Sequence, residues 1–350
     1  MTRTGRAVIV RGQEFSVQEF PVPDPEPGTI LLRQELGGIC GTDLHNWQHG
    51  ITEPTFMGHE AVGIIDSLGS GVTSDYLGNP LVEGDRVVYH PRNSGVPYGF
   101  RTIPAEDPPF SGGFSEYIYL ADPENCVVKF DAPAQVGVLA EPFAVGVHSV
   151  MRGNVQIGDT VIVQGSGAIG LMCQIVARLS GAGRIITIGG PADRLALARK
   201  LGADVTVDID EVPSVEERSA LVMAATPRGE GADVVFECAG FLPAIPEGLG
   251  YVKQDGVFVE VGHFVDVGSF NLNPNTQLLR RNLRLEAIWG SRYHHFVRGL
   301  ALLERNELPY ADMVSHVLPM ERIGEGFDAL NGSYKLGDET VVKIAIGSDL

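Results

Sequence analysis

The glycine-rich segment Gly165-Ser-Gly167-Ala-Ile-Gly170 constrains the fold of this 350-residue chain more than any other feature. It joins an apolar run typical of a strand (160–164) to a run with helical periodicity (168–181). In this spacing the first glycine permits a tight turn, the second lets backbone approach a pyrophosphate, and the third lets helix and strand pack closely. A chain with 44 glycines can produce the spacing by chance, so the strand-to-helix context gives the motif its weight.

Apolar strand segments continue to alternate with helical segments after this turn. Further strand candidates lie at 184–189, 205–207, 232–237, 256–261 and 283–289. Strands that are apolar on both faces and alternate with helices indicate a parallel sheet covered by helices. With the strand at 160–164, the pattern predicts a six-stranded, doubly wound nucleotide-binding sheet.

The part of the chain before this sheet has a different texture. Short β-rich runs, separated by Gly and Pro clusters, occupy 6–10, 29–36, 61–69, 85–90 and 114–120. This punctuation favours a partly closed, barrel-like β unit. The residues after the sheet hold two helical segments (296–306 and 324–330) and a strand (340–346). They are too few for a domain of their own, so we expect them to return to the N-terminal unit.

Charge and hydropathy exclude two classes of partner. The chain has 44 acidic and 26 basic residues, for a formal net charge of -18, and such a surface repels nucleic-acid phosphates. No run approaches the 18 or so apolar residues needed to span a bilayer, and the N-terminus lacks the apolar stretch of a signal peptide. We therefore expect a cytoplasmic protein with neither nucleic acid nor membrane as a partner.

Four potential metal ligands occur in three separate segments: Cys40, His59 with Glu60, and Glu141. One thiolate, one imidazole and carboxylates from different loops suit a catalytic zinc site that keeps a position open for substrate. The residues alone leave alternatives open, since Cys40 also suits a small buried hydrophobe and His59 a structural histidine.

Five segments in this order carry a family resemblance: GGICGTDLH (37–45), GHEAVGII (58–65), GDRV (84–87), AEPFAVGVHSV (140–150) and GSGAIG (165–170). They resemble the zinc-dependent medium-chain dehydrogenase/reductase family, especially its sorbitol and threonine dehydrogenase-like branch. The likeness extends to SHVLP (315–319) and IGEGFD (323–328). It implies an α/β protein with a GroES-like, β-rich catalytic domain (1–152 and 291–350), into which a Rossmann domain (153–290) is inserted.

The resemblance also implies roles for individual residues. Cys40 and His59 would bind zinc, with Glu60 and Glu141 as competing candidates for the third ligand. Asp43 would orient His59, although a solvated loop carboxylate is the alternative. Thr42 and His45 would relay the substrate proton to solvent, unless His45 is a plain surface histidine.

One zinc ion per chain is expected. Many relatives bind a second, structural zinc through four closely spaced cysteines after the GDRV motif. Residues 87–113 contain no cysteine here, so the structural zinc should be absent.

The cofactor preference is less conventional. A Rossmann domain specific for NAD usually ends its second strand in a carboxylate that binds the ribose hydroxyls, whereas this strand ends in Gly189-Gly190-Pro191. Asp193 could supply the ribose contact and Arg194 could meet the adenine or a phosphate. We expect NAD with weak discrimination against NADP. The other residues expected at the cofactor are Gly165, Ser166, Gly167, Ala168, Ile169, Gly170, Gly189, Cys238, Ala239, Val261, Gly262, His263 and Trp289.

The expected function is hydride transfer between NAD(P) and a small-molecule alcohol and its ketone or aldehyde, in a homodimer or homotetramer. Trp47, Phe56, Trp289 and Tyr293 suggest an aromatic pocket that favours a bulky or cyclic secondary alcohol, although each also suits a core. The alternatives are a zinc-free quinone or enoyl reductase and a binding protein without catalysis. The first would not be expected to keep Cys40, His59 and Glu141 together.

Overall fold

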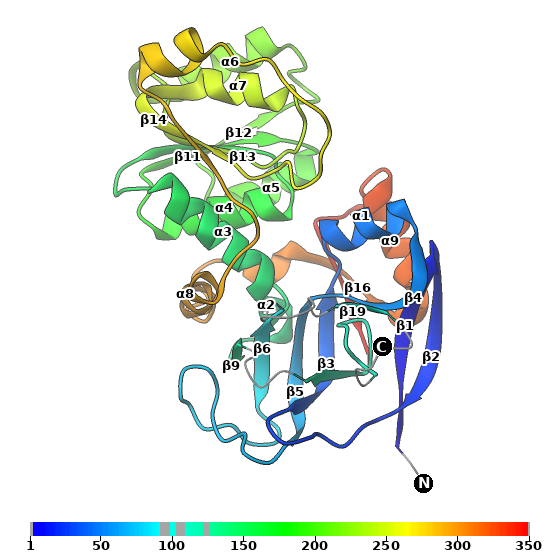
Figure 1. Cartoon of the computed structure of the whole chain (residues 1–350). Helices are drawn as coiled ribbons and strands as arrows, with labels where there is room; N and C mark the ends of the chain where they lie inside the picture. Colours follow the sequence, from blue (N-terminus) through cyan, green and yellow to red (C-terminus); the bar gives the residue numbers. More distant parts are fainter. Residues whose placement is uncertain (1–2, 92–98, 103–108, 122–125, 349–350) are drawn as a thin grey trace. The chain divides into compact units, whose positions relative to one another are not determined.

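The computed structural model describes residues 3–91, 99–102, 109–121 and 126–348 (Figure 1). The chain divides into two compact units. The first comprises Met1–Glu141, Arg292–Asn306 and Tyr310–Leu350, and the second comprises Pro142–Ser291 and Glu307–Pro309. The expected boundary at 152/153 falls at the end of helix α3 (Ala140–Gly153), whereas the units divide near its start.

The first unit is built on two β-sheets. The larger follows the order β16-β19-β3-β5-β6-β9, with β8 also paired to β3, and the smaller follows β2-β1-β4-β7. The bounds are β1 (Thr4–Gly12), β2 (Glu14–Pro21), β3 (Ile30–Gly38), β4 (Ile51–Met57), β5 (Glu60–Leu68), β6 (Arg86–His90), β7 (Phe100–Thr102), β8 (Tyr117–Leu120), β9 (Cys126–Lys129), β16 (Val314–Pro319) and β19 (Lys343–Gly347). Because β19 pairs antiparallel with β3, the C-terminal segment returns to this unit as expected.

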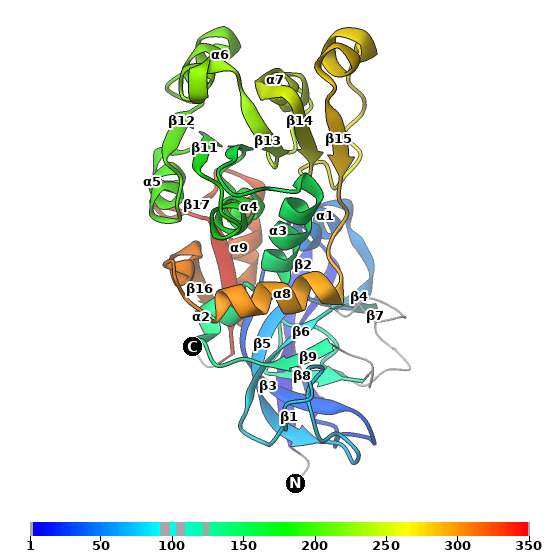
Figure 2. The same ribbon diagram turned by 90° about the vertical axis from the view of Figure 1, so that its left-hand side faces the viewer.

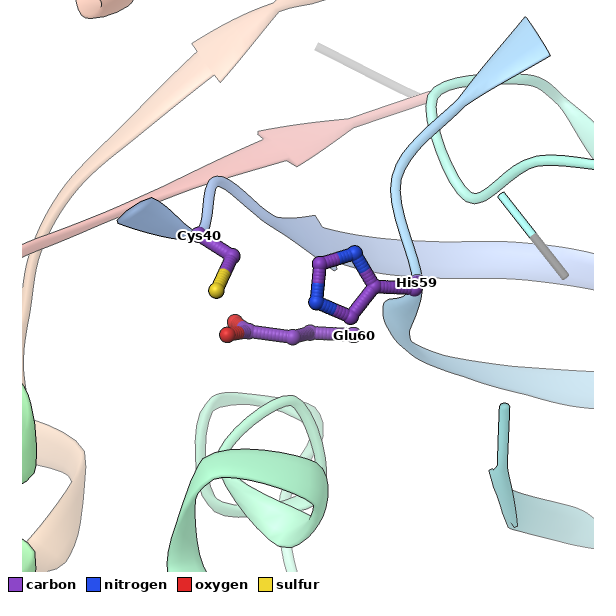
Figure 3. Close-up of side chains that lie close together, drawn as sticks. All are labelled: Cys40, His59 and Glu60. Carbon is purple, nitrogen blue, oxygen red and sulfur yellow. The ribbon is translucent and has the colours of Figure 1, made fainter. Parts of the chain in front are cut away.

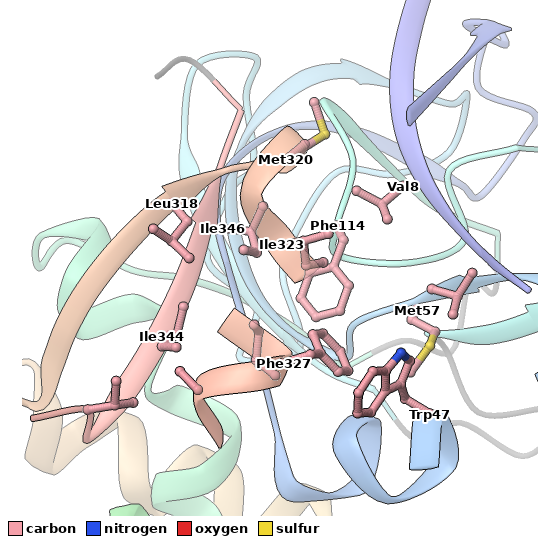
Figure 4. Close-up of a cluster of buried hydrophobic side chains, with 14 residues drawn as sticks. Val8, Trp47, Met57, Phe114, Leu318, Met320, Ile323, Phe327, Ile344 and Ile346 are labelled. Atoms are coloured by element: carbon pink, nitrogen blue, oxygen red, sulfur yellow. The ribbon is translucent and has the colours of Figure 1, made fainter. Parts of the chain in front are cut away.

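The apolar core of the first unit contains two of the aromatic residues expected in a substrate pocket. Trp47, on α1 (Gly41–His49), packs against Phe327 of α9 (Ile323–Asn331) with ring centroids 5.7 Å apart (Figure 4). Its indole N–H donates to the carbonyl of Gln13. Phe56, on β4, is buried against Phe20. The pocket interpretation is therefore wrong for Trp47 and Phe56, because both side chains face the core.

The second unit is the expected doubly wound sheet. Its six strands are all parallel, in the order β12-β11-β10-β13-β14-β15 (Figure 2). Helices α3, α4 and α5 cover one face and α6 and α7 the other (Figure 1). The bounds are β10 (Thr160–Gln164), α4 (Ala168–Leu179), β11 (Arg184–Gly189), α5 (Ala192–Lys200), β12 (Val205–Asp208), α6 (Val215–Ala224), β13 (Ala232–Glu237), α7 (Ala244–Tyr251), β14 (Val252–Glu260) and β15 (Arg284–Ala287). This order is that of a dinucleotide-binding domain, with the topological switch point beside β10.

Helix α8 (Tyr293–Leu303) begins three residues before the expected segment, and α9 and β19 lie where helix and strand are expected. Across the described residues, no helix is both long enough and apolar enough to cross a bilayer. Within the cysteine-free stretch 87–113, residues 92–98 and 103–108 lie outside the described residues, so the expectation about the structural zinc stays a prediction.

Candidate metal centre and cofactor edge

Three of the four expected metal ligands meet at one end of the larger sheet. Cys40 follows β3 and precedes α1, His59 lies between β4 and β5, and Glu60 is the first residue of β5. The antiparallel register of β3 and β5 places Gly38 opposite Glu60. One ligand atom each from Cys40, His59 and Glu60 lies within 4.8 Å of the other two, and the thiol, ring and carboxylate point toward one another (Figure 3).

The loops that present these ligands depend on glycine. A Cβ on Gly38 would lie 2.5 Å from Glu60 Oε2, so only glycine leaves room for that carboxylate. Gly58 has φ +93 and reverses the chain just before His59. A side chain is strained in that backbone region.

Asp43 is fully buried beside His59. Its Oδ2 accepts a hydrogen bond from the Cys40 backbone N–H (2.9 Å), and its Oδ1 lies 3.4 Å from His59 Nδ1. Burial lowers the pKa of His59, but the charges of Asp43 and Cys40 outweigh it, so the pKa rises well above its ordinary value. The carboxylate therefore holds the cysteine loop and faces the imidazole at once.

Lys343 is a functional residue that sequence reasoning missed. It lies on β19, is almost fully buried, and its Nζ contacts Glu60 Oε2. A lone lysine inside the apolar strand run TVVKIAI is the signal that could have found it, because a buried ammonium needs an anionic partner. Glu60 thus shares its carboxylate between the ligand cluster and Lys343.

Glu141, the remaining candidate ligand, is the second residue of α3 and is half-buried. It does not belong to the cluster formed by Cys40, His59 and Glu60. The fold therefore brings Glu60, rather than Glu141, to the cysteine and histidine.

Thr42 and His45 both lie on α1 beside the cluster. The Cys40 thiol donates to Thr42 Oγ1 at 3.8 Å. The ring of His45 contacts that of His49, one helical turn later, with centroids 4.1 Å apart. Partial burial and the neighbouring His49 lower the pKa of His45, so it is neutral, and able to accept a proton, near pH 7. His49 was also missed, although its i, i+4 spacing from His45 predicts contact.

The donor set fits zinc. A thiolate, an imidazole and a carboxylate are common zinc ligands, and three protein ligands leave a position for substrate. Burial and the Glu60 carboxylate raise the pKa of the Cys40 thiol. A bound cation acts in the opposite direction and favours the thiolate.

The glycine turn between β10 and α4 has the geometry that its spacing indicates. Gly165 has φ +105, and a Cβ on Gly170 would lie 1.9 Å from the Gly165 carbonyl oxygen. Gly167 precedes α4 with an ordinary extended conformation (φ -78, ψ 179), and a Cβ there would have no neighbour within 4 Å. The fold itself needs glycine at 165 and 170, whereas at 167 only an incoming ligand requires it.

Ser166 connects this turn to the end of β11. Its hydroxyl donates to the Gly190 carbonyl (2.9 Å) and accepts from the Gly190 N–H (3.1 Å). A Cβ on Gly189 would lie 2.4 Å from Ser166 Oγ. In the first turn of α5, Asp193 is exposed and Arg194 is buried.

The other residues expected at the cofactor also follow the carboxyl ends of parallel strands. Ala168 and Ile169 begin α4, Cys238 and Ala239 follow β13, Val261, Gly262 and His263 follow β14, and Trp289 follows β15, where it is exposed. Four carboxylates near this edge were missed: Asp208, Asp210, Glu237 and Glu260. Two of them lie at the end of β12, the strand next to β11, where the ribose carboxylate was sought: Asp208 is the last residue of β12, and Asp210 follows it.

Two family models match the chain. Residues 26–132 match the alcohol dehydrogenase GroES-like domain, and residues 168–305 match the zinc-binding dehydrogenase domain. The matches agree with the metal cluster in the first unit and the glycine turn in the second.

Similar proteins match over nearly the whole chain. A 5-exo-hydroxycamphor dehydrogenase from Pseudomonas putida is 32% identical, with 92% of this chain and 94% of that protein covered. A sorbitol dehydrogenase from Gallus gallus is 31% identical, with 94% of each covered. The crystal structure of an alcohol dehydrogenase from Thermotoga maritima superposes with a TM-score of 0.90 at 26% identity, covering 99% of this chain and 100% of that one.

Proposed function

This chain belongs to the zinc-dependent medium-chain alcohol dehydrogenase family, and from that membership we propose that Cys40 and His59 hold one catalytic zinc ion. The protein is an oxidoreductase that uses a nicotinamide cofactor to interconvert an alcohol and its ketone or aldehyde. Its relatives do not favour a zinc-free reductase. The observation that carries the zinc proposal is the approach of Cys40, His59 and Glu60 ligand atoms to within 4.8 Å.

Elemental analysis and one variant test the zinc proposal. We expect one zinc per chain, and Cys40→Ser should lose both the metal and turnover while the cofactor still binds, because Cys40 and the glycine turn belong to different units. Cys126→Ser, at a buried cysteine outside the cluster, is the matched control and should keep its zinc. Two tightly bound zinc ions per chain, or an active preparation without zinc, would contradict the proposal.

For the third ligand, the cluster supports Glu60 and leaves Glu141 as the competitor. One Glu60 oxygen contacts Lys343, and the other remains for the metal. Glu60→Gln should therefore lower zinc affinity more than Glu141→Gln, as measured by competition with a chelator. The reverse order would assign the ligand to Glu141.

The neighbouring residues prepare the site and remove the proton. A bound zinc ion would make the substrate hydroxyl more acidic, and a bound nicotinamide cofactor would supply the hydride acceptor. Asp43 fixes the ring of His59 through its contact with Nδ1. Thr42 stands next to the cysteine sulfur, and the neutral imidazole of His45 accepts the proton for transfer to solvent.

For the cofactor, we propose NAD rather than NADP. A Cβ on Gly190 would lie 3.2 Å from Asp210 Oδ2 and 3.6 Å from Asp208 Oδ1, so two carboxylates at the end of β12 lie close to the end of β11, where the ribose carboxylate is usual. They would repel a 2'-phosphate, and Arg194 is buried. We expect kcat/KM to favour NAD, and Asp210→Asn to reduce that preference. A wild-type preference for NADP of more than about tenfold, or about 1.4 kcal/mol, would overturn the proposal.

For the substrate, we propose a secondary alcohol, with a bulky or cyclic one favoured. Two relatives bear names that specify a hydroxycamphor and sorbitol, which support a secondary alcohol but differ in shape. Comparing kcat/KM across a panel of cyclic alcohols and linear polyols distinguishes the two substrate classes. A preference for linear polyols would reject the cyclic class.

We also propose a homo-oligomer, a dimer or tetramer. Strand β15 ends its sheet, and Leu279, Leu285 and Trp289 on or beside it are 69%, 47% and 66% exposed. An edge strand with exposed apolar side chains is a surface that another chain can cover. Light scattering during gel filtration should show more than one chain per particle, and Leu285→Lys should dissociate it.

A further inference from the structure

A second cluster of titratable side chains lies at the carboxyl edge of the second unit. Glu237, the last residue of β13, is fully buried, and its Oε1 accepts hydrogen bonds from the N–H groups of Ala239 (2.8 Å) and Gly240 (3.0 Å). Its Oε2 makes no hydrogen bond and lies 3.3 Å from His263 Nδ1. Glu260, the last residue of β14, lies 2.8 Å from the same nitrogen.

The cluster has more acidic groups than basic ones. Among the described residues, neither carboxylate pairs with a lysine or arginine, and His263 is the ion-pair partner of both. The other titratable groups facing it are Cys238, which follows β13, and Cys173 on α4, and their sulfurs lie 3.8 Å apart. Burial and the charge of Glu260 raise the pKa of Glu237 to about 7. The cluster is therefore poised to gain or lose a proton near neutral pH.

Its place in the sheet relates it to one half of the cofactor. In a doubly wound sheet with this strand order, the dinucleotide crosses the carboxyl edge at the switch point. The glycine turn after β10 faces the pyrophosphate, and β11 and β12 carry the ribose-binding region of the adenosine half. The second set of strands, β13 to β15, is left for the nicotinamide half, and Glu237 and Glu260 end two of these strands.

The loop above the carboxylates leaves no space for a side chain. A Cβ on Gly262 would lie 2.4 Å from Glu237 Oε2. Glu237 Oε2 thus lies directly beneath the backbone that follows β14, on the edge where the ring is expected.

We propose that Glu237, Glu260 and His263 form an anionic seat that binds the oxidised nicotinamide ring in preference to the reduced one and releases a proton as it does so. The inference rests on the nicotinamide cofactor of the proposed function. The oxidised ring carries a positive charge and the reduced ring is neutral, so only the oxidised ring is attracted electrostatically to an ionised Glu237. The released proton comes from the Glu237 carboxyl, and no bond of the cofactor changes.

The direction of the pH dependence follows from this charge balance. Below about pH 6 Glu237 is protonated, so the seat has one negative charge fewer and attracts a cationic ring less strongly. Above about pH 8 it is ionised and attracts the ring. The affinity for NAD+ should therefore rise through neutral pH, while the affinity for NADH changes little.

Titration calorimetry on the zinc-loaded protein tests the seat. Binding of NAD+ and NADH is measured between about pH 6 and pH 8.5, in buffers of different ionisation enthalpy so that released protons are counted. We expect the ratio of the NAD+ and NADH dissociation constants to fall on the order of tenfold over this range. Proton release should accompany NAD+ alone.

Two isosteric variants and one control identify the group that releases the proton. Glu237→Gln keeps the carbonyl oxygen that accepts from Ala239 and Gly240, and it should flatten the ratio and abolish proton release. Glu260→Gln, which removes the neighbouring charge, should move the midpoint to lower pH and remains informative if the first variant fails to fold. Glu230→Gln removes an exposed carboxylate of the same unit and should behave as wild type.

The outcomes separate this proposal from the proposed function. Two results overturn the anionic seat alone. One is binding of both cofactor forms with a ratio of dissociation constants that does not change with pH. The other is a pH dependence of this ratio that persists in Glu237→Gln. Failure to bind either form overturns the dehydrogenase proposal and the seat with it.

Discussion

At the scale of single residues, the buried ion pair between Lys343 and Glu60 couples the metal cluster to the C-terminal strand. The two residues are 4% and 1% exposed. Removing one member leaves a buried charge without a partner, so Lys343→Met should destabilise the protein by about 3 kcal/mol. Urea unfolding of the chelated protein measures this free energy of unfolding. Adding Glu60→Gln to Lys343→Met should restore most of the lost stability.

Lys129→Met is the matched control, because Lys129 forms an ion pair with Asp85 in the same unit but is partly exposed. It should change stability little, since exposed pairs contribute little. Equal losses in the two variants would show that Lys343 has no special role.

His45 gives a second prediction at this scale. Since burial and His49 lower its pKa, it is the neutral base near pH 7, and His45→Gln should slow alcohol oxidation there on the order of 100-fold. The deficit should shrink at high pH, where solvent hydroxide replaces the base. His49→Gln keeps the His45 base and should retain the oxidation rate. It should move the acid limb of the pH–rate profile to higher pH, because His49 would no longer lower the pKa of His45. Identical profiles for His45→Gln and wild type would make it a surface histidine.

At the scale of an element, the turn between β10 and α4 separates what the fold needs from what the ligand needs. Gly167 has a backbone conformation open to any residue and free space at its Cβ position. Gly167→Ala should therefore leave stability unchanged and weaken cofactor binding by about tenfold or more, or about 1.4 kcal/mol. Gly250→Ala, on α7 with equal free space, should bind cofactor normally and gain up to about 1 kcal/mol. Normal cofactor affinity in Gly167→Ala would mean that the pyrophosphate does not approach this glycine.

At the scale of the whole molecule, the metal cluster and the glycine turn belong to different compact units. A ligand stabilises the structure that binds it, so zinc should protect β3 and β5 from hydrogen exchange, and NAD should protect β10 and α4. Mass spectrometry after chelation should show faster exchange in 30–68 and little change in 160–189, with turnover lost and cofactor binding kept. Equal deprotection of both segments would show that the units do not respond separately.

The sequence by itself determined the elements whose signal is local. Alternating apolar strands and helices predicted the parallel sheet, and β10 and β13 lie at the expected residues, because strand and helix periodicities are read within a few neighbours. The glycine spacing gave the turn for the same reason. The sequence also singles out Cys40 and His59 as candidate ligands, since short motifs carry them, and the structure brings them together with Glu60.

The tertiary structure decided contacts that join distant segments. Lys343 meets Glu60 only because β19 pairs with β3 and β3 pairs with β5, and Trp47 belongs to the core because α1 packs near α9. The group of Glu237, Glu260 and His263 forms because adjacent parallel strands end at one edge. Strand order and register determine these contacts, and both depend on packing of the whole chain. No local sequence pattern encodes the distance between two side chains that the fold brings together.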